Sequence, residues 1–148
     1  KKIDYKVFAA SYFEDRVYGG IDALNVRNFW MQQVSYLQDK SVEDILQEIE
    51  DLKKETGKTK IAFWGTGKIC RDLLEKYPMV RVDCFFDNAK QNHGRLINGV
   101  PIVGPDSIHE YQDTLLIITC AMYLEIGAQL DNAGLHQYKD YVTYLDVF

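Results

Sequence analysis

An apolar run that ends in a glycine-rich turn is the feature that most constrains how this chain can fold. Residues 60–64 are followed at once by a Gly-Thr-Gly turn at 65–67, and an amphipathic stretch continues from there. A second apolar run, residues 82–86, ends in Asp87. This order predicts a strand, a tight turn, a helix, a second strand and an acidic residue, the layout of a dinucleotide-binding βαβ unit.

Each residue of the turn has a physical reason to favour a bound phosphate. Gly65 can adopt backbone angles that other residues avoid, which permits an abrupt change from strand to helix. Gly67 has no side chain, so a pyrophosphate can approach its backbone beside Thr66. The helix that begins there offers free N–H groups and the positive end of its dipole, at Lys68 and Ile69. The Lys68 ammonium either contacts the phosphate or points into solvent.

The turn is a degenerate version of the dinucleotide fingerprint. Cys70 stands where a third glycine is usual, and it is small enough for the helix and strand to pack closely. The alternative interpretation is a tight strand-to-helix turn that holds no ligand. A Walker A loop is excluded because Gly67 and Lys68 are followed by Ile69 rather than by Ser or Thr.

Acidic and small polar residues follow the neighbouring strands. Asp87 is expected to accept hydrogen bonds from ribose hydroxyls, which would favour NAD over NADP, with Asn88 beside it. The alternative is a turn cap, because Asp-Asn is favourable turn chemistry. Thr119 and Cys120 end a later strand and are expected to form part of the pocket wall. No general base is identifiable that would make Cys120 a nucleophile.

The second part of the chain, residues 58–148, alternates strand and helix patterns. We therefore expect an α/β fold, a Rossmann-like parallel sheet flanked by helices. A helix over 121–133 is expected to face inward through Met122, Ile126 and Leu130. The expected strands are residues 60–64, 80–86, 100–103, 114–119 and 141–145; the other expected helices are 67–77 and 105–111.

The first part, residues 1–57, is predicted to be a helical extension. One amphipathic helix is expected around residues 24–37, and a second begins after Ser41 and ends at Gly57. Their apolar faces are too large to leave in water, so the helices must pack on the α/β domain, on each other or on a partner. A homo-oligomer or a contact with a parent protein through these helices is one of these alternatives.

Composition excludes several classes of function. The net charge is −5 and Lys and Arg do not cluster, so we expect no nucleic acid partner. No apolar run approaches about 18 residues, so no membrane span is expected. Three scattered cysteines argue against a disulfide framework and a zinc site, and favour a reducing, cytoplasmic setting.

Three segments carry a resemblance to a known group of proteins: residues 61–67, 85–88 and 97–105. They resemble the small Rossmann-like domains of bacterial surface-polysaccharide biosynthesis. These domains look like the N-terminal parts of nucleotide-sugar dehydratases and acetyltransferases, or the tail domains of glycosyltransferases and sugar C-methyltransferases. The resemblance implies binding of NAD or a nucleotide sugar, in a role accessory to a glycosyltransferase or sugar-modifying enzyme.

Two other functions remain open at this point. The first is a catalytic NAD-dependent sugar oxidoreductase or transferase domain, for which His93, Cys120 and Tyr123 are the candidate acid–base residues. The second is a protein-interaction module whose glycine turn is vestigial. We expect no metal site in any of the three cases.

Overall fold

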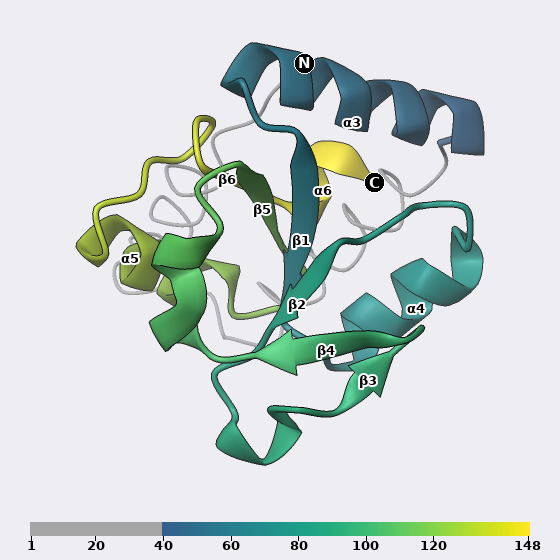
Figure 1. Cartoon of the computed structure of the whole chain (residues 1–148). Helices are drawn as coiled ribbons and strands as arrows, with labels where there is room; N and C mark the ends of the chain where they lie inside the picture. The colour runs from purple at the N-terminus through teal and green to yellow at the C-terminus, as the bar shows by residue number, and fades with distance from the viewer. Residues whose placement is uncertain (1–39) are drawn as a thin grey trace, which may run out of the picture. The chain divides into compact units, whose positions relative to one another are not determined.

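The sheet is built outward from the apolar strand that precedes the glycine turn. The computed structural model describes residues 40–148 (Figure 1). In it, β1 (Lys60–Trp64) lies between β2 (Cys84–Phe86) and β5 (Thr114–Ile118) and is parallel to both. Residues 61–64 are all buried, because both faces of a central parallel strand are covered.

Five of the six strands are parallel, and the sixth is antiparallel at one edge. The strand order is β3-β4-β2-β1-β5-β6, where β3 is Leu96–Ile97, β4 is Val100–Val103 and β6 is Tyr141–Thr143. The predicted α/β fold is therefore confirmed, but the sheet is mixed rather than all parallel. The exception is β3, which pairs with β4 through the turn at Asn98 and Gly99, both with positive φ (50° and 79°).

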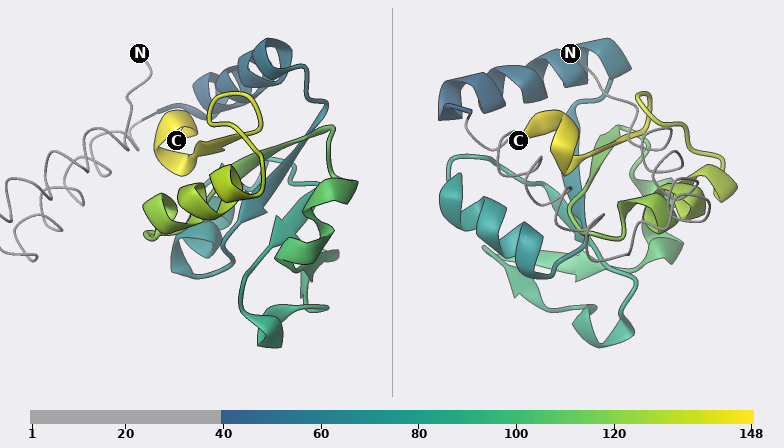
Figure 2. Two further views of the ribbon diagram at one scale, coloured as in Figure 1. Left: turned by 90° about the vertical axis from the view of Figure 1, so that its left-hand side faces the viewer. Right: turned by 180° about the vertical axis from the view of Figure 1, so that it is seen from behind.

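The helices cover the two faces of the sheet. Helix α4 (Lys68–Lys76) connects β1 to β2, and α5 (Tyr123–Asn132) connects β5 to β6. These two connections advance in opposite directions along the sheet, so right-handed crossovers place their helices on opposite faces. The views from the front and from behind show α4 and α5 on opposite sides (Figures 1 and 2). Two 3-10 turns, η1 (Lys90–Asn92) and η2 (Pro105–Glu110), lie in the loops between β2 and β5.

The helix before the sheet forms as predicted. Helix α3 (Val42–Thr56) buries Ile45, Ile49 and Leu52 on one face and ends at Gly57, whose φ is +72°. Residues Val42–Val147 make one compact unit, so the predicted boundary after residue 57 falls inside a unit that contains α3. The helix predicted around residues 24–37 lies outside the described residues.

Three local expectations are corrected. Residues 80–83 are not a strand, because the Asp83 side chain accepts the Ile61 N–H (3.1 Å) where a strand pair would form. The last strand stops at Thr143, and α6 (Tyr144–Val147) follows. Asp146 accepts the Thr143 N–H at 2.9 Å, which is the reciprocal half of a capping box.

The third correction concerns α5. Met122 is 61% exposed, whereas Tyr123, Gly127 and Leu130 are buried. Met122 stands at the N-cap outside the helix, so the buried face is set by the later residues. Among residues 40–148, no helix is both long and apolar enough to cross a bilayer.

Candidate functional site

The candidate site lies where the strand order reverses. From β1 the chain moves to β2 on one side, and from β5 it moves to β6 on the other. The last residues of β1 and β5, Trp64 and Ile118, are paired in register, so the turns that follow both strands meet at one edge of the sheet. Open α/β sheets bind ligands in the crevice outside such a reversal.

The two turns are in direct contact. The Thr119 hydroxyl donates a 2.7 Å hydrogen bond to the Gly65 carbonyl. A Cβ added at Gly65 would lie 2.9 Å from the Cys120 Cβ, and the φ of Gly65 is +111°. Glycine is therefore required at residue 65 by backbone angle and by close approach together. The structure brings Gly65, Thr119 and Cys120 together as the sequence predicted.

The N–H groups of the turn divide into two sets. The Gly65 N–H donates to Phe86 O at 2.9 Å, and the Thr66 N–H donates to an Asp87 carboxylate oxygen at 3.2 Å. Within the described part of the chain, the N–H groups of Gly67, Lys68 and Ile69 have no recorded acceptor, and Gly67 gives α4 no side-chain cap. The free donors therefore begin at Gly67, the last residue of the glycine turn.

The space outside Gly67 is open. A Cβ built there meets no atom within 4 Å, and Gly67 is exposed. Helix α4 behind it runs for nine residues, long enough to contribute a dipole whose positive end lies at these free donors. A negatively charged group can therefore approach the backbone at Gly67 without displacing a side chain of the described residues.

Asp87 is occupied by its own chain. Its Oδ2 accepts the N–H and the hydroxyl of Thr66 and the side-chain amide of Asn92 (3.4 Å). Its Oδ1 accepts the Ala89 N–H at 2.8 Å. A carboxylate offers about two acceptor positions on each oxygen, so Oδ2 is fully used and Oδ1 keeps one position. The hydrogen bonds are those of the turn-cap interpretation, and a ribose contact by Asp87 stays a prediction.

These hydrogen bonds also set the ionisation of Asp87. Burial alone would raise the pKa of the carboxyl, but the bonds from Thr66, Ala89 and Asn92 outweigh it and hold the pKa below its usual value. The carboxylate is therefore charged at neutral pH. Its position beside the Thr66 N–H disfavours an anion at residues 65–66 and leaves the donors at 67–69 as the anion site.

We expect Asp87→Asn to destabilise the domain by about 1–3 kcal/mol at pH 7, because hydrogen bonds to a charged acceptor are replaced by weaker ones. The folded pKa of Asp87 is lowered, so the folded state binds fewer protons than the unfolded state at mildly acidic pH. The stabilisation is therefore present above the unfolded pKa and is lost as the pH falls through the folded pKa. Urea unfolding at pH 7 and pH 3 should show the difference between wild type and variant shrinking in acid; an unchanged difference would contradict this role.

Asn88 has a partner that sequence reasoning missed. Asn88 and Gln129 exchange two amide hydrogen bonds, of 2.8 Å and 3.1 Å. This pair joins the loop after β2 to α5 at the predicted site. No local pattern around Gln129 signals the contact, because the two residues are 41 positions apart.

The side chains of the first turn of α4 differ in exposure. The Lys68 side chain is 86% exposed, and its ammonium lies 2.5 Å from the Asp72 carboxylate one turn along the helix. Ile69 is half-buried, and Cys70 is fully buried against the sheet, as expected for a residue replacing the third glycine. Burial raises the pKa of the Cys70 thiol to about 12, so Cys70 packs as an apolar residue.

None of the three candidate acid–base residues is poised for catalysis. Burial raises the pKa of the Cys120 thiol, which disfavours the reactive thiolate. The His93 Nε2 lies 2.7 Å from the Asp87 carbonyl oxygen, and its ring packs against Gly104. Tyr123 is 9% exposed and its ring contacts Tyr144 edge-on. Among residues 40–148 no group of His, Cys, Asp and Glu is placed to hold a metal ion.

Comparison with known proteins places the chain in a family. A family model described as C2185-like, N-terminal, matches residues 57–140, more than half of the 148-residue chain. The chain belongs to the C2185-like N-terminal family. No curated protein matches it. In this C2185-like domain the matched segment contains every predicted site residue, from Gly65 to Cys120, while α3 precedes it.

Proposed function

We propose that the C2185-like domain binds a nucleotide, NAD or a nucleotide sugar, with its phosphates at the start of α4. One observation carries the proposal: the N–H groups of Gly67, Lys68 and Ile69 have no acceptor among the described residues, and the space beside Gly67 is open. Consecutive free N–H groups at a helix N-terminus form a ready anion site. Their place beside the reversal of strand order is where nucleotides bind in open α/β sheets.

The order of the parallel strands supports a Rossmann-like fold. Without the edge strand β3, the order β4-β2-β1-β5-β6 places the first parallel strand in the middle, followed outward by the second and third on one side. The fourth and fifth lie on the other side. Dinucleotide-binding sheets use the same order and place the pyrophosphate at the turn after the first strand. In this chain that turn is residues 65–67.

The biological setting that we propose comes from the resemblance of segments 61–67, 85–88 and 97–105. We propose an accessory nucleotide-binding domain of a bacterial polysaccharide-biosynthesis protein, serving a glycosyltransferase or a sugar-modifying enzyme. A catalytic role would need an acid–base residue in the crevice. The candidate residues offer no support for one. Burial raises the pKa of the Cys120 thiol, the His93 ring nitrogen is hydrogen-bonded, and the Tyr123 ring is buried.

A second candidate is favoured by the hydrogen bonds that Asp87 accepts from its own chain. With four donors from its own chain, the carboxylate closes the turn as a purely structural feature would. This candidate is an interaction module with a vestigial nucleotide site. It shares the fold with the first candidate and differs in predicting that no nucleotide binds.

Calorimetric titration with NAD, NADP, UDP-glucose and coenzyme A separates the two candidates. We expect at least one diphosphate-containing nucleotide to bind with Kd below about 1 mM, and NAD to bind better than NADP because the Asp87 charge lies beside the turn. Adenosine, which lacks phosphate, is the matched control and should bind at least tenfold more weakly. If no nucleotide binds at millimolar concentration, the nucleotide proposal is rejected and the interaction module remains.

A further inference from the structure

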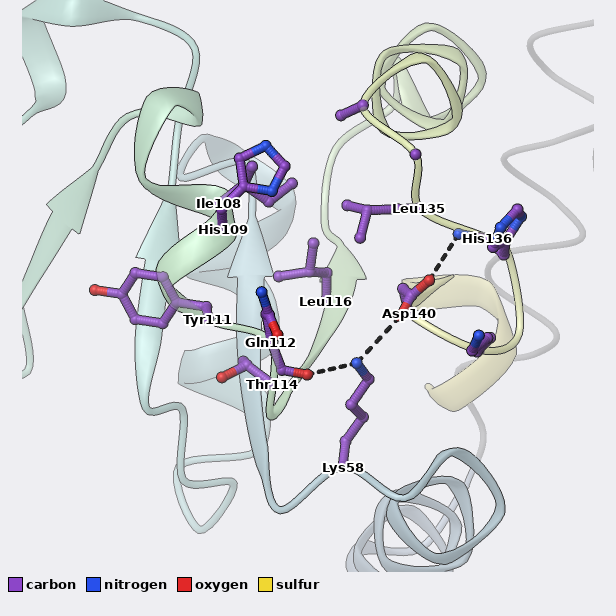
Figure 3. A pocket seen from close by; sticks show the side chains of 13 residues that line it. Lys58, Ile108, His109, Tyr111, Gln112, Thr114, Leu116, Leu135, His136 and Asp140 are labelled. Carbon is purple, nitrogen blue, oxygen red and sulfur yellow. Dashed lines mark hydrogen bonds and ion pairs between the residues drawn. The ribbon is translucent and has the colours of Figure 1, made fainter.

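A hollow lies at the end of the sheet opposite the glycine turn, where β1, β5 and β6 begin. Its volume is about 500 Å³, and it opens between the end of η2 and the loop that joins α5 to β6 (Figure 3). We propose that this hollow binds a small organic anion, a carboxylate carried on an apolar body. The residues that carry the argument are Lys58, Ile108, Leu116, Leu135, His136 and Asp140.

The hollow is separate from the proposed nucleotide site. Lys58 precedes β1, whereas Gly65 follows it. The five residues of β1, at about 3.3 Å each, place the two ends of the strand about 16 Å apart. The inference is therefore independent of the proposed function. The volume of the hollow lies within the range of about 300–1,000 Å³ that is usual for small-molecule sites.

The ammonium group of Lys58, which lines the hollow, is fixed by two acceptors. The Lys58 Nζ donates to the Gln112 carbonyl oxygen at 2.6 Å and lies 3.1 Å from an Asp140 carboxylate oxygen (Figure 3). The side chains of Lys58 and Asp140 are only 14% and 13% exposed. An ammonium has three hydrogens, so two fixed acceptors orient the group and leave one hydrogen for a ligand.

Asp140 holds the lysine and the loop in place. Its other oxygen accepts the His136 N–H at 2.9 Å. Burial would raise the pKa of Asp140, but the bonds from His136 and Lys58 and the nearby positive charge lower it, so the carboxylate stays charged at neutral pH. The Asp140 carboxylate partly neutralises the Lys58 ammonium. Removing the charge of Asp140 should therefore strengthen anion binding.

The remaining lining matches an amphipathic anion. The side chains of Ile108, Leu116 and Leu135 supply apolar surface beside the ammonium (Figure 3). Asp140 is the only carboxylate among the lining residues, whereas Lys139 accompanies Lys58. Positive groups therefore outnumber negative ones around an apolar wall, which is the pattern that a carboxylate on an apolar body fits.

Three probes separate the two halves of the proposal. Benzoate has both the charge and the ring, benzyl alcohol has the ring without the charge, and inorganic phosphate has charge without an apolar body. In ¹H–¹⁵N NMR titration of the full chain, we expect benzoate to shift the amide signals of residues 108–116 and 133–140 with Kd of about 1–10 mM. Benzyl alcohol and phosphate should bind at least fivefold more weakly. Equal binding of benzyl alcohol, binding of phosphate alone, or no shift with benzoate would each overturn the proposal.

Opposite effects of two substitutions test the ion pair itself. Lys58→Gln should weaken benzoate binding at least tenfold, whereas Asp140→Asn should strengthen it about fivefold, because Asn can still accept the His136 N–H but no longer neutralises Lys58. The double variant, which leaves no unpaired charge, should bind as weakly as Lys58→Gln and guards against misfolding of that variant. Lys60→Gln, which removes an exposed lysine paired with Asp113 at 3.7 Å, is the control and should change nothing. Unchanged or weaker binding by Asp140→Asn would contradict the assigned geometry.

Discussion

We expect Gly67→Asp to weaken the proposed nucleotide binding strongly and to leave the domain at least as stable as wild type. A side chain at residue 67 meets no atom within 4 Å, so it enters without a steric cost. Asp is a favoured N-cap residue, and it would accept free N–H groups of α4, which adds roughly a few tenths of a kcal/mol relative to Gly. The same carboxylate occupies the donors that a phosphate would use and repels the phosphate. We therefore expect Kd to rise at least about 100-fold, which corresponds to about 2.7 kcal/mol.

Two further variants at residue 67 isolate the cause. Gly67→Asn supplies a similar cap without the charge, so it should weaken binding less than Gly67→Asp while stabilising the helix comparably. Gly67→Ala adds only a methyl group and tests whether the ligand approaches the backbone closely. Thermal unfolding and calorimetric titration of the three variants provide the measurements. A Gly67→Asp protein that binds nucleotide with the wild-type Kd would remove the start of α4 from the site.

Gly65→Ala is expected to destabilise the domain by about 3 kcal/mol. The φ of Gly65 is +111°, an angle that costs a residue with a Cβ about 1–2 kcal/mol. The added methyl would also lie 2.9 Å from the Cys120 Cβ and 3.3 Å from the Thr119 carbonyl oxygen, both on the neighbouring turn. Relieving that overlap requires the two turns to separate, and overpacking of this kind adds about 1–3 kcal/mol.

Gly94→Ala is the matched control for Gly65→Ala. Gly94 also has a positive φ, +84°, but a Cβ there meets nothing within 4 Å. It should therefore show the backbone cost alone, about 1 kcal/mol. Urea denaturation of both variants measures the difference, which reports the contact between the turns after β1 and β5. Equal losses in the two variants would show that this contact contributes nothing.

The parts of the fold that were predictable from sequence depend on local patterns. The apolar run of β1, the glycine turn and the Asn98–Gly99 hairpin each have a signature that lies within a few residues. The same holds for α3, whose buried residues Ile45, Ile49 and Leu52 keep helical spacing. The capping pair Thr143 and Asp146 was also present in the sequence, and it would have ended the last strand at the correct residue.

The parts that were not predictable depend on contacts between distant residues. The bond from the Thr66 N–H to Asp87 spans 21 positions, and it fixes the turn in a way that no local pattern signals. The Asp83 carboxylate shortens β2 by taking an N–H of β1, 22 positions away. Neither composition nor periodicity indicates which carboxylate will accept hydrogen bonds from the chain's own N–H groups. For the same reason the sequence did not reveal that the Gly65 and Thr66 N–H groups are taken by Phe86 and Asp87.

The most direct test of the account follows the individual amides of the turn while a nucleotide is added. In ¹H–¹⁵N NMR titration with ADP, we expect the largest shifts at the amides of Gly67, Lys68 and Ile69. The Gly65 and Thr66 amides, which donate to Phe86 and Asp87, should move much less. Saturable binding of ADP with no shift at residues 67–69, or no binding at all, would contradict the claim that these free N–H groups hold a phosphate.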